Sequence, residues 1–173
     1  INKWDTNTYL DVNHPLQQAC KSVLEECTGE SVEHIGIDGC GAPLMSASLT
    51  GLARSFSQFA GPSADADQRK ISQAIKEFPE YESGTRRDDF ELMKGVPGLV
   101  SKIGAEAVYA VGLGDGRALA LKIDDGADRA RTVVAATILR DVLGVVAQVV
   151  EKQTSIPLLG GGKQVGEIRA VLN

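Results

Sequence analysis

Lys102 is the first residue whose type and position suggest chemistry. It begins the triplet Lys102-Ile103-Gly104, a few residues before a strand that we expect to start near Ala107. A lysine at the edge of a sheet can supply positive charge to a substrate carboxylate or shift the pKa of a neighbouring group. The alternative is a solvated lysine whose alkyl stem lies on the sheet.

The turn at residues 38–43 is a second candidate, with the sequence Asp-Gly-Cys-Gly-Ala-Pro. Glycines on both sides of Cys40 allow backbone N–H groups and the thiol to approach a ligand closely. A complete zinc site within the chain is not expected, because no Cys-x-x-Cys or histidine pair accompanies Cys40. A nucleophilic cysteine would need a nearby histidine, and no pattern ties His14 or His34 to this turn. The alternative is a buried turn cysteine.

Two glycine-rich stretches look like nucleotide-binding motifs but lack the required context. Residues 112–116 join one expected strand to another, whereas a dinucleotide-binding motif opens a helix after a strand. Residues 159–164 lack the spacing and the Ser or Thr of a phosphate-binding P-loop. We expect a hairpin turn and a flexible turn at these two places.

The candidate side chains need elements to position them, and apolar periodicity together with turn residues predicts those elements. Helices are expected at residues 15–28, 48–60, 67–78, 86–94 and 128–152, with a loop at 80–84. Strands are expected at residues 32–37, 107–113, 118–123 and 163–172, the second and third forming a hairpin. This order favours an α+β or α/β fold, with an antiparallel sheet covered by helices, over a doubly wound parallel sheet. One domain spanning residues 1–173 is expected.

The first expected helix carries two of the three cysteines. Asn13 is expected to cap its start, and Gly29 to end it. Cys20 and Cys27 share one face but lie about 10 Å apart along the axis, too far for a disulfide. We therefore expect both to be small buried residues of the core.

Composition limits the classes of partner. The net charge is −5 and the basic residues do not cluster, so a nucleic-acid surface is not expected. Arg140 and Asp141 interrupt the apolar run at 132–150, which predicts a buried helix of a soluble protein with no membrane partner. Three cysteines, an odd number, and no signal-peptide pattern favour the cytoplasm. Because the chain begins without Met, we expect it to be part of a longer protein.

Several stretches, in order along most of the chain, resemble the C-terminal half of the rhizobial-type L-asparaginase family. That family is related in fold to serine β-lactamases and glutaminases, and the Lys102 triplet is similar to the Lys-Thr-Gly of the β-lactamases. The matching stretches are His14-Pro15-Leu16-Gln17, Gly36-Ile37-Asp38-Gly39-Cys40-Gly41-Ala42-Pro43, Ser101-Lys102-Ile103-Gly104-Ala105-Glu106-Ala107, Tyr109-Ala110-Val111-Gly112-Leu113 and Leu121-Lys122-Ile123-Asp124-Asp125-Gly126.

The resemblance implies roles for three residues. Lys102 matches the family's C-terminal active-site lysine, which lies near the nucleophilic serine. Asp38 matches a residue placed to bind the amino-acid substrate. Cys40 matches a cysteine that can hold zinc together with another cysteine and a lysine, so this chain would carry only part of the ligand set. The Asp88 region departs from family members that have a cysteine there.

The resemblance also implies a partner and an activity for the chain. In the family, the Ser-x-x-Lys nucleophile precedes this segment, so we expect an N-terminal half of the same protein as a partner. The expected activity is hydrolysis of L-asparagine to aspartate and ammonia by an activated serine, in a homo-oligomer, and the isolated chain is expected to be inactive. The alternatives are another β-lactamase-like hydrolase, such as a glutaminase or peptidase, and a non-catalytic scaffolding half.

Overall fold

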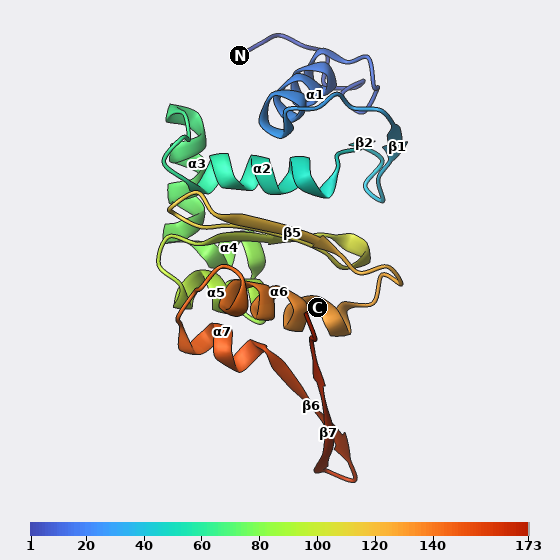
Figure 1. Cartoon of the computed structure of the whole chain (residues 1–173). Helices are drawn as coiled ribbons and strands as arrows, with labels where there is room; N and C mark the ends of the chain where they lie inside the picture. Colours follow the sequence, from blue (N-terminus) through green and yellow to red (C-terminus); the bar gives the residue numbers. More distant parts are fainter. Residues whose placement is uncertain (173) are drawn as a thin grey trace. The chain divides into compact units, whose positions relative to one another are not determined.

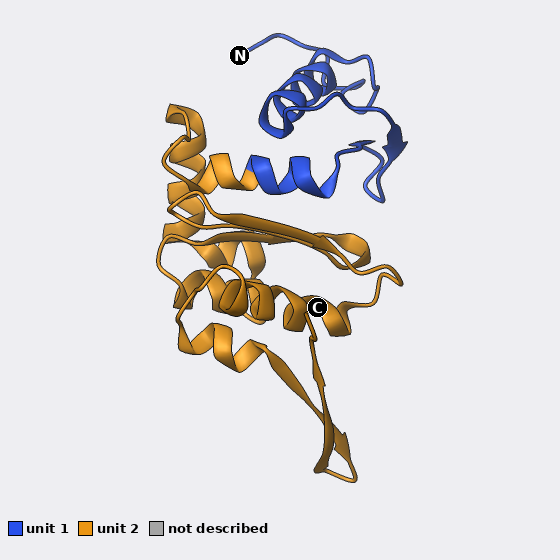
Figure 2. Cartoon of the chain, viewed as in Figure 1, with its two compact units in different colours: residues 1–55 blue, residues 56–173 orange. Residues whose placement is uncertain are grey.

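The computed structural model describes residues 1–172. The chain divides into two compact units, residues 1–55 and residues 56–173, which are coloured separately in Figure 2. The expectation of one domain over residues 1–173 stays a prediction.

The first unit contains the long helix α1 (Pro15–Thr28). Its range agrees with the sequence prediction, and Gly29 ends it with a φ of 69° in the left-handed region. The N-cap, however, is His14 and not Asn13, because the His14 imidazole accepts the N–H of Leu16. The prediction of buried cysteines on this helix was wrong, since Cys20 is exposed and Cys27 is half-buried.

The first unit also contains a short antiparallel hairpin of β1 (Ile35–Ile37) and β2 (Pro43–Met45). The sequence prediction placed a longer strand at 32–37 and missed β2, whose three residues include a proline. The helix α2 (Leu49–Ala60) follows and continues into the second unit.

The second unit is built on a three-stranded antiparallel sheet in the order β3-β4-β5. The strands are β3 (Val100–Ile103), β4 (Val108–Gly112) and β5 (Ala118–Lys122). The predicted hairpin of β4 and β5 is confirmed, whereas β3 was not predicted as a strand. Gly112 of β4 lies against the last turns of α2, where an added Cβ would be 2.7 Å from the Cβ of Ala60. Glycine therefore permits this close packing.

Three helices lead from α2 to the sheet (Figure 1): α3 (Ala66–Glu77), α4 (Pro79–Ser83) and α5 (Asp88–Gly95). Asp65 and Gln68 form a reciprocal capping box at the start of α3. The predicted loop at 80–84 was wrong, because Pro79 both ends α3 and occupies the first turn of α4. Proline lacks an N–H and is pre-set for a helix start, so it can do both.

The predicted single helix at 128–152 was also wrong. The structure has α6 (Asp128–Asp141) and α7 (Gln148–Gln153), separated by a bend in which Gly144 has a φ of 64°. Such a backbone conformation interrupts a helix and favours glycine. A second hairpin follows, formed by β6 (Ser155–Gly160) and β7 (Lys163–Arg169). Of these, only β7 was predicted.

The core of the second unit lies between the sheet and the helices α5, α6 and α7, which cover one face of it (Figure 1). Its fully buried members include Leu92, Tyr109, Val111, Leu139 and Val150. Helices with small antiparallel sheets confirm the α+β class. The narrower resemblance to the serine β-lactamase fold stays a prediction.

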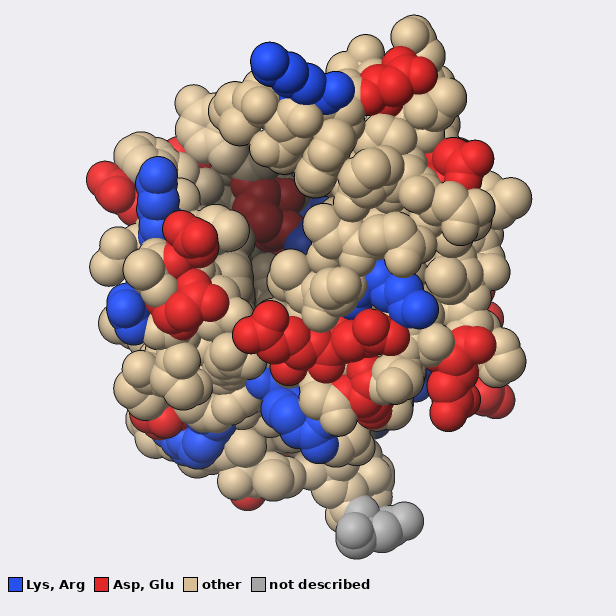
Figure 3. All heavy atoms as spheres, turned by 90° about the horizontal axis from the view of Figure 1, so that it is seen from above, with Lys and Arg blue, Asp and Glu red and all other residues tan. Residues whose placement is uncertain are grey.

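Two further observations concern membranes and nucleic acids. Within residues 1–172, no helix is long and apolar enough to cross a bilayer. On the face drawn in Figure 3, basic side chains lie as separate spots among acidic ones. This distribution is unlike the concentrated positive surface that phosphate backbones require.

Candidate functional site

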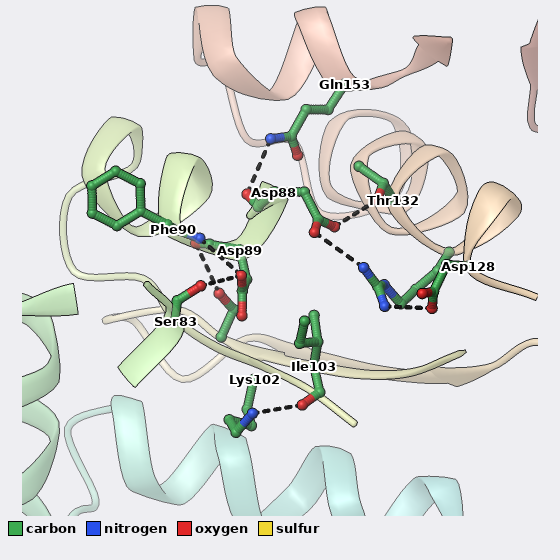
Figure 4. A network of polar contacts seen from close by, with 11 residues as sticks. Ser83, Asp88, Asp89, Phe90, Lys102, Ile103, Asp128, Thr132 and Gln153 are labelled. Carbon is green, nitrogen blue, oxygen red and sulfur yellow. Dashed lines mark hydrogen bonds and ion pairs between the residues drawn. The ribbon is translucent and has the colours of Figure 1, made fainter. Parts of the chain in front are cut away.

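Lys102 lies on β3, at the edge of the three-stranded sheet, and pairs in register with Ala110 of β4. Its side chain is 52% exposed, but its ammonium group is not freely solvated. Nζ donates a hydrogen bond to the carbonyl oxygen of Ile103 at 2.7 Å, as Figure 4 shows. It also lies 3.3 Å from Oε1 of Glu82. The head group is therefore held at a defined place at the sheet edge by two acceptors.

Glu82, the partner of Lys102, comes from α4 and is nearly buried, with a side chain only 13% exposed. Both of its carboxylate oxygens are buried without a hydrogen-bond partner among the described residues, so the contact with Lys102 is an ion pair. Burial raises the pKa of the Glu82 carboxyl, and the Lys102 ammonium opposes this effect. Sequence reasoning missed Glu82 because it placed residues 80–84 in a loop. Proline at 79 and glycine at 84 were the signal that could have revealed a helical turn.

A chain of polar contacts connects the segments that carry Glu82 and Lys102. Ser83, the next residue after Glu82, donates its hydroxyl to Oδ1 of Asp89, which is fully buried at the start of α5 (Figure 4). Ser101, the residue before Lys102, donates its hydroxyl to the backbone carbonyl of Asp89 at 3.3 Å. Asp89 thus connects α4 to β3 through the residues next to Glu82 and Lys102.

A second group of contacts fixes α5 against α6 and α7. Asp88 accepts from Arg131 at 3.1 Å and from Thr132 at 2.5 Å, and its backbone carbonyl accepts from Gln153 at 3.1 Å. Arg131 is also paired with Asp128 at 2.7 Å. Because these contacts join α5 to α6 and α7 and the Arg131 and Asp88 side chains are largely buried, the arrangement indicates a structural role: it holds the helices in place.

Two hollows lie near the pair in the second unit. One, of about 540 Å³, is apolar and lies along α3 and α4, with Glu82 in its lining. The other, of about 440 Å³, is polar and is lined by Gly104, Glu106, Arg87 and Arg131 among others. Arg131 is neutralised there by its two aspartates, so this second hollow carries no strong excess of positive charge for an anion.

Asp38 and Cys40 lie together in the first unit, in the turn between β1 and β2. The Asp38 N–H donates to the carbonyl of Ala42, and the Gly41 N–H donates to the carbonyl of Asp38. The Cys40 thiol lies 3.5 Å from Oδ2 of Asp38 and donates to it. Cys40 is exposed, so the expectation of a buried turn cysteine was wrong. Both side chains are presented to solvent by a tight, glycine-containing turn.

The turn does not provide a complete zinc site. Among residues 1–172, no group of three or more His, Cys, Asp or Glu side chains is arranged to hold a metal ion. Cys40 and Asp38 could supply two donors, whereas a structural zinc site takes four protein ligands and a catalytic one three. The residues present therefore do not fit a zinc ion by themselves, and no chemical step is derived through one.

The structure thus brings together two of the three predicted site residues, Asp38 and Cys40, and places Lys102 in the second unit beside a buried carboxylate. Comparison with known proteins gives a family for the chain as a whole. The family model of L-asparaginase II matches residues 1–170. No curated protein matches the chain. The match covers essentially the whole sequence, and the chain therefore belongs to the L-asparaginase II family.

Proposed function

We propose that the protein containing this chain hydrolyses the side-chain amide of L-asparagine, releasing aspartate and ammonia. The observation that carries the proposal is the match of the L-asparaginase II family over residues 1–170. The held ammonium group of Lys102, at the edge of a sheet, supports it further, because an ordered cation is what a reaction with developing negative charge uses.

The proposed reaction is acyl transfer through a serine. The serine hydroxyl oxygen, from a segment preceding this chain, attacks the side-chain amide carbon, and its proton is passed to the departing nitrogen, which leaves as ammonia. Water then cleaves the resulting ester to release aspartate and restore the serine hydroxyl. In this scheme, Lys102 either lowers the pKa of the serine or stabilises the negative charge that develops on the amide oxygen.

The two residues of the β1–β2 turn have separate proposed roles. The exposed carboxylate of Asp38 suits an ion pair with the ammonium group of an amino-acid substrate. The exposed thiol of Cys40 can act as one ligand of a zinc ion whose other ligands come from outside this chain.

We further propose that the preceding half of the same protein packs on this chain. The apolar stripe of α1 supports this proposal, since Leu16 and Val23 are 38% and 58% exposed and Cys20 is exposed beside them. Unpaired apolar surface of this kind is typical of an interface. The odd number of cysteines, three, supports placement in the reducing cytoplasm. A homo-oligomer stays a proposal based on the resemblance alone.

The test is to express the complete protein and measure ammonia and aspartate released from L-asparagine. L-Glutamine, a β-lactam and a dipeptide serve as competing substrates in parallel assays. We expect asparagine to be hydrolysed with the highest kcat/KM of the four. Turnover of the β-lactam or dipeptide without ammonia release from asparagine would favour another β-lactamase-like hydrolase. No measurable hydrolysis of any of the four substrates would favour a non-catalytic scaffolding role.

A further inference from the structure

The ammonium group of Lys102 is held by two different interactions. It donates a hydrogen bond to the carbonyl of Ile103, and it forms an ion pair with Glu82, whose Oε1 lies 3.3 Å from Nζ. An ammonium group that loses either partner gains freedom to rotate and is placed less precisely for a reacting group.

Glu82 is placed to act on Lys102 rather than on a substrate. Its side chain is 13% exposed, and both carboxylate oxygens are buried. Lys102, in contrast, is 52% exposed. A small molecule arriving at the sheet edge can thus reach the lysine but not the carboxylate behind it.

The position of Glu82 is fixed independently of Lys102. The turn α4 starts at the buried Pro79 and ends at Gly84, whose φ is 76°. Ser83 is hydrogen-bonded to Asp89, whose backbone carbonyl is in turn bound by Ser101 of β3. The spacing between Glu82 and Lys102 is therefore set by a rigid connection, and the ion pair does not have to order a flexible segment.

The geometry points to Glu82 as a positioning residue for Lys102. Glu82 pairs with the ammonium group and, together with the carbonyl of Ile103, fixes the place from which it acts on the reacting group of the substrate or nucleophile. This inference rests on the proposed function, because it requires Lys102 to take part in amide hydrolysis.

The electrostatic surroundings of the pair support the inference. The charged groups that act on the Glu82 carboxyl are Lys102 from β3, Asp89 from α5 and Arg87 just before α5. Burial and Asp89 raise the pKa of Glu82, whereas Lys102 and Arg87 lower it. The attraction between Glu82 and Lys102 thus involves a carboxylate that is largely buried, and removing that carboxylate takes away the charge partner of the Lys102 ammonium group.

The experiment compares kcat and KM for asparagine hydrolysis by the complete protein, with rates expressed per folded enzyme. Its variants are Glu82→Gln, Glu82→Asp and Lys102→Ala. The matched control is Glu77→Gln, which removes an exposed carboxylate at the end of α3. In Glu82→Gln, we expect kcat to fall about tenfold, because the ammonium is less well held, while KM changes by less than about twofold.

The conservative variant and the control separate positioning from stability. Glu82→Asp keeps the charge, so its kcat should recover part of the loss, and Glu77→Gln should match the wild type in both kcat and KM. The folded fraction of each variant is measured by thermal unfolding, so a loss of stability in Glu82→Gln is not counted as a loss of kcat. Wild-type kcat in Glu82→Gln, with Lys102→Ala inactive, would overturn the inference alone. Full activity in Lys102→Ala, or no hydrolysis by the wild type, would overturn the proposed function and the inference with it.

Discussion

At the scale of single residues, the side chains with proposed roles differ in how firmly the protein holds them. Lys102 is fixed by a carbonyl and a carboxylate, and that carboxylate belongs to a turn anchored by buried polar groups. Asp38 and Cys40 are exposed and lie in a turn whose hydrogen bonds are local. A substitution at the turn should therefore alter the binding of substrate or zinc and have little effect on folding. Substitutions of exposed residues usually change the free energy of unfolding by less than about 0.5 kcal/mol.

Cys40→Ser tests the role of the turn thiol. In the complete protein, we expect the variant to bind zinc more weakly or to have a severalfold higher KM for asparagine, because the hydroxyl is a much poorer metal ligand than a thiolate. The melting temperature should stay within about 2 °C of the wild type. Zinc content, kinetics and thermal unfolding are measured on the same preparation, alongside the wild type. A lower melting temperature with unchanged kinetics and zinc content would assign Cys40 a purely structural role.

At the scale of elements, the turn between β3 and β4 is strained. Glu106 has a φ of 55° and a ψ of 34°, and Ala107 also has a φ of 55°. For a residue with a Cβ, the left-handed conformation costs about 1–2 kcal/mol. The turn is therefore higher in energy than an unstrained one. Glu106 lies three residues after Ile103, whose carbonyl accepts a hydrogen bond from the Lys102 ammonium.

Glu106→Gly should relieve part of this strain. The Glu106 side chain is exposed, so its removal costs little packing. We expect the free energy of unfolding to rise by about 1 kcal/mol, as measured by urea denaturation. Ala105→Gly is the matched control, because Ala105 lacks a positive φ and glycine there should give no gain. Equal effects of the two substitutions would contradict the presence of strain at Glu106.

Elements with strong local signals could be predicted from the sequence. The ends of α1, for example, follow from Pro15 and Gly29, and the β4–β5 hairpin from its glycine-containing turn. The errors arose where tertiary context decides. Residues 128–152 are apolar along most of their length, so periodicity alone did not reveal the bend at Gly144 between α6 and α7. The strands β3 and β6 are short and gain their hydrogen bonds from distant or later segments.

The candidate site was predictable only in part for the same reason. Lys102, Asp38 and Cys40 were found from their motifs, and the proximity of Asp38 to Cys40 follows from the turn. Glu82 has no motif of its own, and it meets Lys102 only because Asp89 ties α4 to β3. Contacts between residues twenty positions apart depend on packing, which the pattern of a single sequence does not specify.

At the scale of the whole molecule, the proposed reaction requires a catalytic serine from a preceding segment. The isolated chain of residues 1–173 should therefore release no ammonia from asparagine above the level of its Lys102→Ala variant. Adding the preceding segment as a separate polypeptide should restore activity, because the exposed apolar stripe of α1 offers it a surface. Val23→Asp should lower the restored activity, because it places a charge in this apolar stripe. Ammonia release by the isolated chain would show that the nucleophile lies within it.

The central claim is that this chain contributes Lys102 to amide hydrolysis. Its most direct test is kcat/KM for L-asparagine in the complete protein carrying Lys102→Ala, Lys102→Arg or Lys122→Ala. Lys122 is a matched control, because it is an exposed strand lysine whose Nζ likewise donates to the carbonyl of the following isoleucine. We predict a loss of about 10²-fold or more in Lys102→Ala and a large loss in Lys102→Arg, because the planar guanidinium does not reproduce the compact ammonium, with Lys122→Ala unchanged. Wild-type kcat/KM in both Lys102 variants would contradict the account and leave Lys102 as a surface lysine.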